Sequence, residues 1–262
     1  MNLLDAHNHV HDARLAPHRA AIFAELARIG VARAVVNGTR EDDWDAVAAL
    51  ASANAFVVPA FGLHPWHVAT RTPQWLEKLR TQLAVHPLAG VGEIGLDRWT
   101  EGHDLAVQTE VFTAQLALAA ELNRPATIHC LRAWGPLWDL IRSHPLPARG
   151  FLLHAYGGPA EMVHGFLEHG AYFSFSPSFL AEKKSTQREI FRTLDATRLL
   201  VETDAPDLRP PDDRNPRPLD GALNHPANID LAHHALAELR GVTPESLAAR
   251  VAENFARLFG ES

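Results

Sequence analysis

Residues 88–122, LAGVGEIGLDRWTEGHDLAVQTEVFTAQLALAAEL, contain the two kinds of segment that decide the fold. Residues 88–93 form a short, mostly apolar run with two glycines, which is typical of a buried strand. Residues 105–122 carry apolar side chains three and four positions apart, including Val107, Val111 and Leu118, which indicates a helix. A buried strand followed by such a helix is the repeating unit of parallel α/β folds.

The same alternation runs along the whole chain. Strands are predicted over residues 3–7, 32–37, 57–61, 88–93, 126–129, 151–154, 172–174 and 199–202. Helices are predicted over residues 16–29, 42–52, 73–85, 105–122, 134–142, 160–169, 184–194, 229–240 and 244–259. Eight strands, each followed by a helix, predict an α/β fold of the (β/α)₈ TIM-barrel type, with a doubly wound open sheet as the alternative. No repeat or linker divides the chain, so we expect a single barrel domain over residues 1–262.

Composition narrows the functional classes. The chain has 262 residues, of which 47% are hydrophobic and 21% charged, as in ordinary globular proteins. Its formal net charge of −7 lacks the basic surplus of a non-specific polyanion binder, although metals and a local basic rim could still attract DNA. We see no signal peptide, no apolar run long enough for a membrane and no sign of an obligate protein partner, so we expect a cytoplasmic protein.

The first predicted strand ends in the sequence Asp5-Ala6-His7-Asn8-His9. Alternate residues of a strand point to the same side, so His7 and His9 can both face the mouth of the barrel. Asp5 lies on the same side and can support them from below. A lone pair of histidines is a weak signal, which gains weight only if other ligands reach the same place.

Four further potential ligands occur at or just after the ends of predicted strands: Glu93, His129, His154 and Asp204. The carboxyl ends of barrel strands meet at one face, so all six side chains should converge there. Four imidazoles and two carboxylates predict a site for two divalent metal ions, with zinc first and manganese or magnesium as alternatives. Glu93, in the middle of the ligand order, is the candidate bridge between the ions. Asp204, with a second oxygen free, is the candidate general base.

At these residues the chain resembles the TatD-like metal-dependent hydrolases of the amidohydrolase superfamily. The matching segments are residues 5–9 (DAHNH), 62–65 (GLHP), 92–97 (GEIGLD), 128–130 (IHC), 173–176 (FSFS) and 202–206 (ETDAP), together with His154 and Asn254. The resemblance implies that one ion is held by His7, His9, Glu93 and Asp204, and the second by Glu93, His129 and His154. It also implies hydrolysis of DNA phosphodiesters, with deacylation of misacylated transfer RNA as another proposed activity.

Several positions depart from the common family pattern. Trp66 stands where a second histidine is common, and Leu131 replaces the usual arginine, with Arg132 one position later. Residues 155–158 read AYGG where Cys-Phe-Ser-Gly is common, and His225 stands in place of a glutamate. These departures fall among the residues expected to touch substrate. The candidate substrate-binding residues are His64, Trp66, Arg132 and Tyr156.

Some residues remain open to two interpretations. Trp66, Trp99 and Tyr156 could stack on bases or pack as lids over neighbouring loops. The loop 207–226 should overhang the site, and its arginines, nearly balanced by aspartates, predict a solvated loop of mixed charge. Cys130 follows a ligand, and strand alternation predicts that it points away from the mouth as an inert thiol.

The function favoured by the sequence is a phosphodiesterase, specifically a deoxyribonuclease, that uses a metal-activated water. The alternative is an amide, ester, lactone or aminoacyl-ester hydrolase that acts on a small molecule or on aminoacyl-tRNA. A third reading, a non-catalytic metal-binding protein, is disfavoured because structural zinc sites are usually closed cages of four ligands.

Overall fold

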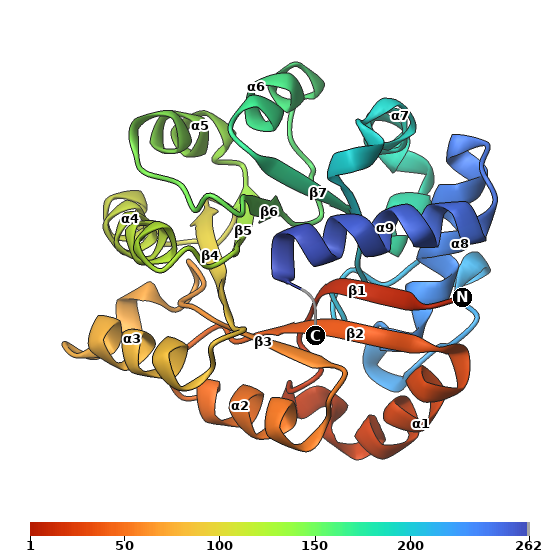
Figure 1. Ribbon diagram of the computed structural model, residues 1–262, viewed down its shortest axis with the longest axis horizontal. Helices are drawn as coiled ribbons and strands as arrows, with labels where there is room; N and C mark the ends of the chain where they lie inside the picture. Colours follow the sequence, from red (N-terminus) through yellow and green to blue (C-terminus); the bar gives the residue numbers. More distant parts are fainter. Residues whose placement is uncertain (261–262) are drawn as a thin grey trace.

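The computed structural model describes residues 1–260 and has the predicted barrel architecture (Figure 1). Neighbouring strands pair in parallel in the order β1-β2-β3-β4-β5-β6-β7-β8. Their bounds are β1 Leu3–Asn8, β2 Val31–Asn37, β3 Val57–Phe61, β4 Gly90–Asp97, β5 Ala126–Leu131, β6 Phe151–Leu153, β7 Ala171–Phe175 and β8 Leu199–Val201. The order follows the sequence without reversal, which excludes the doubly wound sheet.

The seam between β8 and β1 is joined just beyond the end of β8. The backbone N–H of Asp204 donates to the carbonyl of His7 at 2.9 Å, and the N–H of His9 donates to the carbonyl of Ala205 at 2.7 Å. Asp5 accepts hydrogen bonds from the N–H and the hydroxyl of Thr203, at 3.0 and 2.6 Å. Asp5 therefore supports the seam on which three of the six predicted metal ligands lie.

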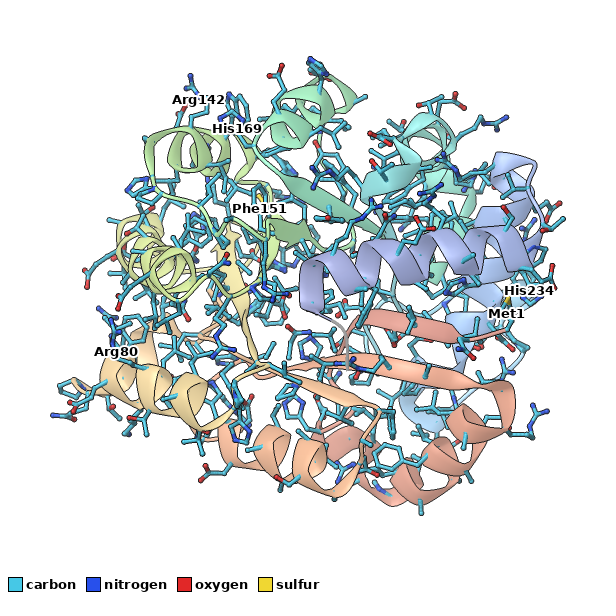
Figure 2. All side chains as sticks on the ribbon, in the orientation of Figure 1. Met1, Arg80, Arg142, Phe151, His169 and His234 are labelled. Atoms are coloured by element: carbon cyan, nitrogen blue, oxygen red, sulfur yellow. The ribbon has the colours of Figure 1, made fainter. Side chains whose placement is uncertain are left out.

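The helices surround the strands (Figure 1). They are α1 Arg19–Ile29, α2 Trp44–Ala53, α3 Trp75–Val85, α4 Leu105–Glu121, α5 Trp134–Ser143, α6 Val163–Glu168, α7 Ser185–Thr193, α8 Ile229–Arg240 and α9 Pro244–Phe259. Figure 2 shows Arg80 and Arg142 extending outward from this layer, whereas Phe151 is fully buried. None of the helices in residues 1–260 has the length and apolar composition of a membrane span.

Helix α9 covers the amino-terminal end of the barrel. Its Asn254 donates to the carbonyl of Leu199, the first residue of β8, at 2.8 Å. Its Phe255 lies under the guanidinium of Arg33, near the start of β2, at 5.9 Å. The opposite, carboxyl-terminal end of the barrel carries the strand-to-helix loops and the predicted ligands.

Two strands are longer than the sequence pattern indicated. β4 continues to Asp97 and β5 to Leu131, so Glu93 and His129 lie inside strands and do not end them. The prediction failed because a polar residue was taken as the end of the strand, whereas in a barrel a polar side chain can point inward at the mouth. Helices α1 and α6 begin later than predicted because 3₁₀ turns, Ala13–His18 and Ala160–Met162, precede them.

Candidate metal centre

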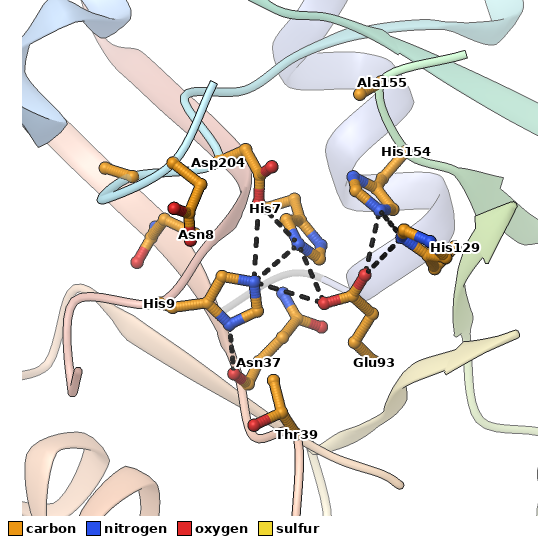
Figure 3. Close-up of polar contacts among 12 residues, drawn as sticks. His7, Asn8, His9, Asn37, Thr39, Glu93, His129, His154, Ala155 and Asp204 are labelled. Atoms are coloured by element: carbon orange, nitrogen blue, oxygen red, sulfur yellow. Dashed lines mark hydrogen bonds and ion pairs between the residues drawn. The ribbon is translucent and has the colours of Figure 1, made fainter. Parts of the chain in front are cut away.

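Three of the predicted ligands meet at the seam between β1 and the segment after β8 (Figure 3). The Nε2 atoms of His7 and His9 are 3.1 Å apart. Oδ1 of Asp204 lies 3.2 Å from the Nε2 of His7 and 3.4 Å from that of His9. We call these three residues the seam cluster; all are buried.

Glu93 of β4 completes the seam cluster from across the barrel mouth. Its Oε2 lies 3.2 Å from Nε2 of His9 and 3.6 Å from Nε2 of His7. Four ligand atoms placed tetrahedrally about 2.0–2.1 Å from a zinc ion would be about 3.3–3.4 Å from one another. His7, His9 and Asp204 lie 3.1–3.4 Å from one another, and Glu93 lies 3.2–3.6 Å from the two histidines, so these atoms can hold one divalent cation.

The other carboxylate oxygen of Glu93 faces a second group of donors. Oε1 lies 2.9 Å from Nε2 of His154 and 3.2 Å from Nδ1 of His129. These two nitrogens are 3.3 Å apart. We call His129 and His154 the cavity cluster. One oxygen of Glu93 thus faces each cluster, which is the arrangement a bridging carboxylate requires.

Outer contacts fix which imidazole nitrogen faces the centre. Nδ1 of His9 lies 2.7 Å from the carbonyl of Asn37, an acceptor only, so this nitrogen carries the proton and Nε2 is free to bind a metal. Nε2 of His129 lies 2.8 Å from Oδ2 of Asp97, which likewise frees Nδ1. The sequence prediction missed the role of Asp97. The even spacing from Glu93 to Asp97 was the available signal, because it places both on one face of a strand continued to residue 97.

Glu202 provides a similar contact behind His154. Its Oε1 lies 3.6 Å from Nδ1 of His154, and its Oε2 accepts a short hydrogen bond from the hydroxyl of Ser174. Glu202 is fully buried, and its place in the ETDAP segment gave no sign of this role. At 3.6 Å this contact is longer than a hydrogen bond, but the negative charge of Glu202 favours a proton on Nδ1 of His154 and leaves Nε2 toward Glu93.

Electrostatics keep the shared carboxylates ionised. Burial raises the pKa of Glu93, but the surrounding histidines outweigh it and hold that pKa well below its usual range. Asp204 behaves likewise, because its hydrogen bonds with His7 and His9 lower its pKa more than burial raises it. Burial lowers the pKa of His9 and His154, yet the carboxylates raise both above the usual value. Cations bound between these groups would take the place of the protons.

Close backbone packing around Glu93 explains the glycines of the GEIGLD segment. A Cβ at Gly95, which has φ of 148°, would lie 1.9 Å from the carbonyl oxygen of His129. A Cβ at Gly92 would lie 2.8 Å from both the Asn37 side chain and Cβ of Thr127. Side chains at either position would push β4 away from its neighbours, so glycine allows β4 to bring Glu93 beside β5.

A cavity of about 780 Å³ opens above both clusters. His64 and Trp66 line it, at the positions expected for substrate contacts. Nε2 of His64 lies 3.4 Å from Oε1 of Glu93. The backbone N–H of Trp66 donates to Nδ1 of His64 at 3.2 Å, so Nε2 carries the proton of the neutral ring. Burial lowers the pKa of His64 well below its ordinary value, which keeps the ring neutral.

Two predicted substrate residues are placed elsewhere. Tyr156 is fully buried, and its hydroxyl donates to the carbonyl of Pro159 at 2.7 Å, so the prediction that it contacts substrate is wrong. Its ring packs against Trp134 and Phe173, which accounts for the burial. Arg132 is not in the cavity wall, since its guanidinium stacks over Trp99 at 4.1 Å.

Cys130 and the long loop also differ from expectation. Cys130 lines the cavity, together with Leu131 of the same strand and Trp134 at the start of α5, whereas the prediction had it pointing away from the mouth. Burial raises the pKa of its thiol, consistent with the expected inertness.

The loop after β8 was predicted to be solvated, but Arg217 within it is not. Its guanidinium forms a bidentate pair with Asp230 at 2.7 Å and a hydrogen bond to Glu25 at 3.0 Å. These contacts fasten the loop after β8 to helices α1 and α8.

Two histidine-rich clusters that share a glutamate, at the carboxyl end of a (β/α)₈ barrel, define the class of metal-dependent barrel hydrolases. Similarity to known proteins identifies the family within this class. A family model described as "TatD related DNase" matches residues 4–260, so the chain belongs to that family and is a metal-dependent hydrolase.

Individual relatives agree over nearly the full length. The chain is 27% identical to the "uncharacterized metal-dependent hydrolase YabD" of Bacillus subtilis over 98% of each protein. It is 30% identical to the "3'-5' ssDNA/RNA exonuclease TatD" of Pantoea vagans, with 94% of this chain and 95% of that protein covered. The crystal structure of YJJV, a TatD homologue from Escherichia coli, superposes with a TM-score of 0.91 at 26% identity, and covers 99% of this chain and 98% of that one.

Proposed function

We propose that the protein is a two-metal nuclease that hydrolyses phosphodiester bonds of single-stranded nucleic acid. The observation that carries this proposal is the position of Glu93, whose two carboxylate oxygens face two separate donor sets. Paired metal ions sharing a ligand are a common arrangement for phosphoryl hydrolysis. The names of the exonuclease relatives support a nucleic-acid substrate.

The residues that would hold the ions follow from the donor sets. His7, His9, Asp204 and Oε2 of Glu93 would hold one ion, and His129, His154 and Oε1 of Glu93 the other. When bound, two divalent cations would neutralise phosphate charge and make a water molecule more acidic. We propose zinc for this nitrogen-rich set, with manganese or magnesium as alternatives.

His64 lies close enough to Glu93 and His129 to be considered a ligand as well. Its hydrogen bonding argues against that role. A neutral imidazole offers one lone pair in the ring plane, and the Trp66 N–H already occupies the one on Nδ1. Nε2 of His64 is therefore a hydrogen-bond donor, which we assign to a phosphoryl oxygen of the substrate.

Asp204 is the proposed general base. Its Oδ1 faces the two imidazoles of the seam cluster, which leaves Oδ2 to accept the proton of the attacking water. Asp204 also lines the cavity, so that water and substrate can reach it. Its φ of 53° is uncommon outside glycine, and the bond from its N–H to His7 holds this conformation.

A substrate panel tests the proposal. Protein reconstituted with zinc, manganese or magnesium is incubated with single-stranded DNA, RNA, a dinucleotide, aminoacyl-tRNA and a lactone. We expect metal-dependent release of nucleotides from the single strands, abolished by chelation while the circular dichroism spectrum stays that of the folded barrel. Turnover confined to the lactone or the aminoacyl ester would replace the nuclease assignment with the small-molecule or aminoacyl-ester hydrolase.

A further inference from the structure

Two of the six tryptophans stand out by their exposure. Trp66 is 54% exposed and Trp99 is 59% exposed, whereas the other four are buried or half-buried. Both lie on loops at the carboxyl end of the barrel, after β3 and β4 respectively. Exposing two large aromatic rings to water costs free energy. Exposed apolar groups of this kind, close to a reaction site, are typical of a surface that binds a ligand.

The neighbouring loop adds an apolar side chain and a cation. Leu131, at the end of β5, is 37% exposed and lines the cavity. The guanidinium of Arg132 lies over the Trp99 ring at 4.1 Å. The N–H of Arg98 donates to the carbonyl of Leu131 at 2.9 Å, which ties the loop of Trp99 to that of Arg132. We call Trp66, Trp99, Leu131 and Arg132 the aromatic rim.

Asp97 connects the aromatic rim to the metal centre. Its Oδ2 accepts the indole N–H of Trp66 at 2.9 Å and faces Nε2 of His129 at 2.8 Å. Its Oδ1 accepts the backbone N–H of Trp99 at 2.6 Å. One carboxylate thus positions a ligand of the cavity cluster and both exposed tryptophans. The aromatic rim is therefore joined to the cavity cluster through Asp97.

A comparison within the chain shows what is special about Arg132. Arg142 also lies over a tryptophan, Trp138, at 5.4 Å, but Asp139 neutralises it at 2.6 Å. Within residues 1–260, Arg132 forms no ion pair with a carboxylate. Its charge is therefore available to a phosphate, next to a ring available to a base.

We infer that the aromatic rim binds the single-stranded segment that leads to the scissile phosphodiester. This inference rests on the proposed nuclease function and names the part of the substrate that lies at the edge of the cavity and beyond it. Bases stack on Trp66 and Trp99, and Arg132 contacts the backbone phosphates. Stacking on aromatic rings and contacts with cations suit single strands of any sequence. The shift of the arginine from position 131 to 132 places its charge on the rim and not in the cavity.

The test compares long and short substrates. Trp99→Ser, Trp99→Phe and Arg132→Ala are assayed as metal-loaded enzymes, with Arg142→Ala as the matched control. The KM for an oligothymidylate of about a dozen nucleotides should rise about tenfold or more in Trp99→Ser relative to the KM for the thymidine dinucleotide. Arg132→Ala should change in the same direction, Trp99→Phe should stay near wild type, and Arg142→Ala should equal it.

Binding is measured separately, by fluorescence anisotropy with a labelled phosphorothioate oligothymidylate that resists hydrolysis. The aromatic rim predicts the same order of dissociation constants as of KM values. Wild-type affinity in both Trp99→Ser and Arg132→Ala, or equal losses on the long and short substrates, would overturn the inference. If the wild type hydrolyses no phosphodiester but its oligonucleotide binding depends on Trp99, the nuclease proposal fails and the aromatic rim stands.

Discussion

The seam cluster and the cavity cluster differ in how completely they surround an ion. The seam cluster offers three donors, and Glu93 adds a fourth, at spacings close to those of a tetrahedral metal site. The cavity cluster offers two histidines, and Glu93 adds a third donor. His129 is the most exposed of these ligands, at 15% of its side chain, whereas His154, at 6%, is less exposed than His9 and Asp204, at 10% each. Because it offers one protein donor fewer, the cavity cluster would leave its ion more coordination positions for substrate and water.

Glu93→Gln should have the largest effect, because both clusters depend on this one carboxylate. The amide keeps the size but removes the charge that balances two cations. We expect one ion to be lost and turnover to fall by about 10³-fold or more, since a bound metal contributes several kcal/mol to such reactions. Metal analysis of the purified, folded variant checks this. Two equivalents of metal in the variant would contradict the bridging role.

Asp204→Asn distinguishes the two roles proposed for Asp204, that of metal ligand and that of general base. The amide oxygen can still coordinate weakly, but it cannot take a proton from water. Turnover should fall by at least about 10²-fold, while substrate binding falls much less. The comparison has to be made at matched metal occupancy. Wild-type turnover with both metals in place would mean that Asp204 is not the base.

Of the two metal-binding clusters, Asp97→Asn should affect only the cavity cluster. The amide has one acceptor oxygen where the carboxylate has two, so it cannot serve both Nε2 of His129 and the backbone N–H of Trp99, and it removes the negative charge that holds the proton on Nε2. We expect the weaker ion to bind about 10–100-fold more weakly, with the other ion unchanged. Titration calorimetry with zinc resolves the two affinities, and Asp42→Asn, a cavity carboxylate with 75% of its side chain exposed, is the control. Equal weakening of both ions would remove the distinction between the clusters.

The acid dependence of the free energy of unfolding tests a residue of the scaffold and not of the metal centre. His233 is buried in α8, and burial lowers its pKa to about 4, against about 6.5 in an unfolded chain. Between these values the unfolded chain binds the extra proton, so acid lowers the free energy of unfolding by up to about 3 kcal/mol, with no effect above pH 7.

The matched pair for this prediction is His233→Gln and His234→Gln in metal-free protein. His234 is the exposed neighbour on the same helix. Denaturant unfolding at pH 7 and pH 4.5 should show a weaker acid dependence in His233→Gln than in wild type, and no change in His234→Gln. The same acid dependence in both variants would show that His233 does not set it.

Much of this arrangement could be predicted from the sequence, for physical reasons that are visible in particular residues. Alternating strand and helix patterns predicted the barrel, and the rule that strand ends share one face brought His7, Glu93, His129 and Asp204 together in advance. Local patterns could not show that β4 continues past Glu93, so Asp97 was missed. Nor could they show which loop residues fold inward: Tyr156 joined the core, whereas Trp99 remained outside.

The central claim is that two ions share Glu93 between a nearly closed and an open cluster. Anomalous diffraction from crystals grown with zinc or manganese tests it most directly. We expect two peaks about 3.5–4 Å apart, one among His7, His9 and Asp204 and one beside His129 and His154, with an oxygen of Glu93 next to each. A single peak, or a second peak away from His129 and His154, would contradict it.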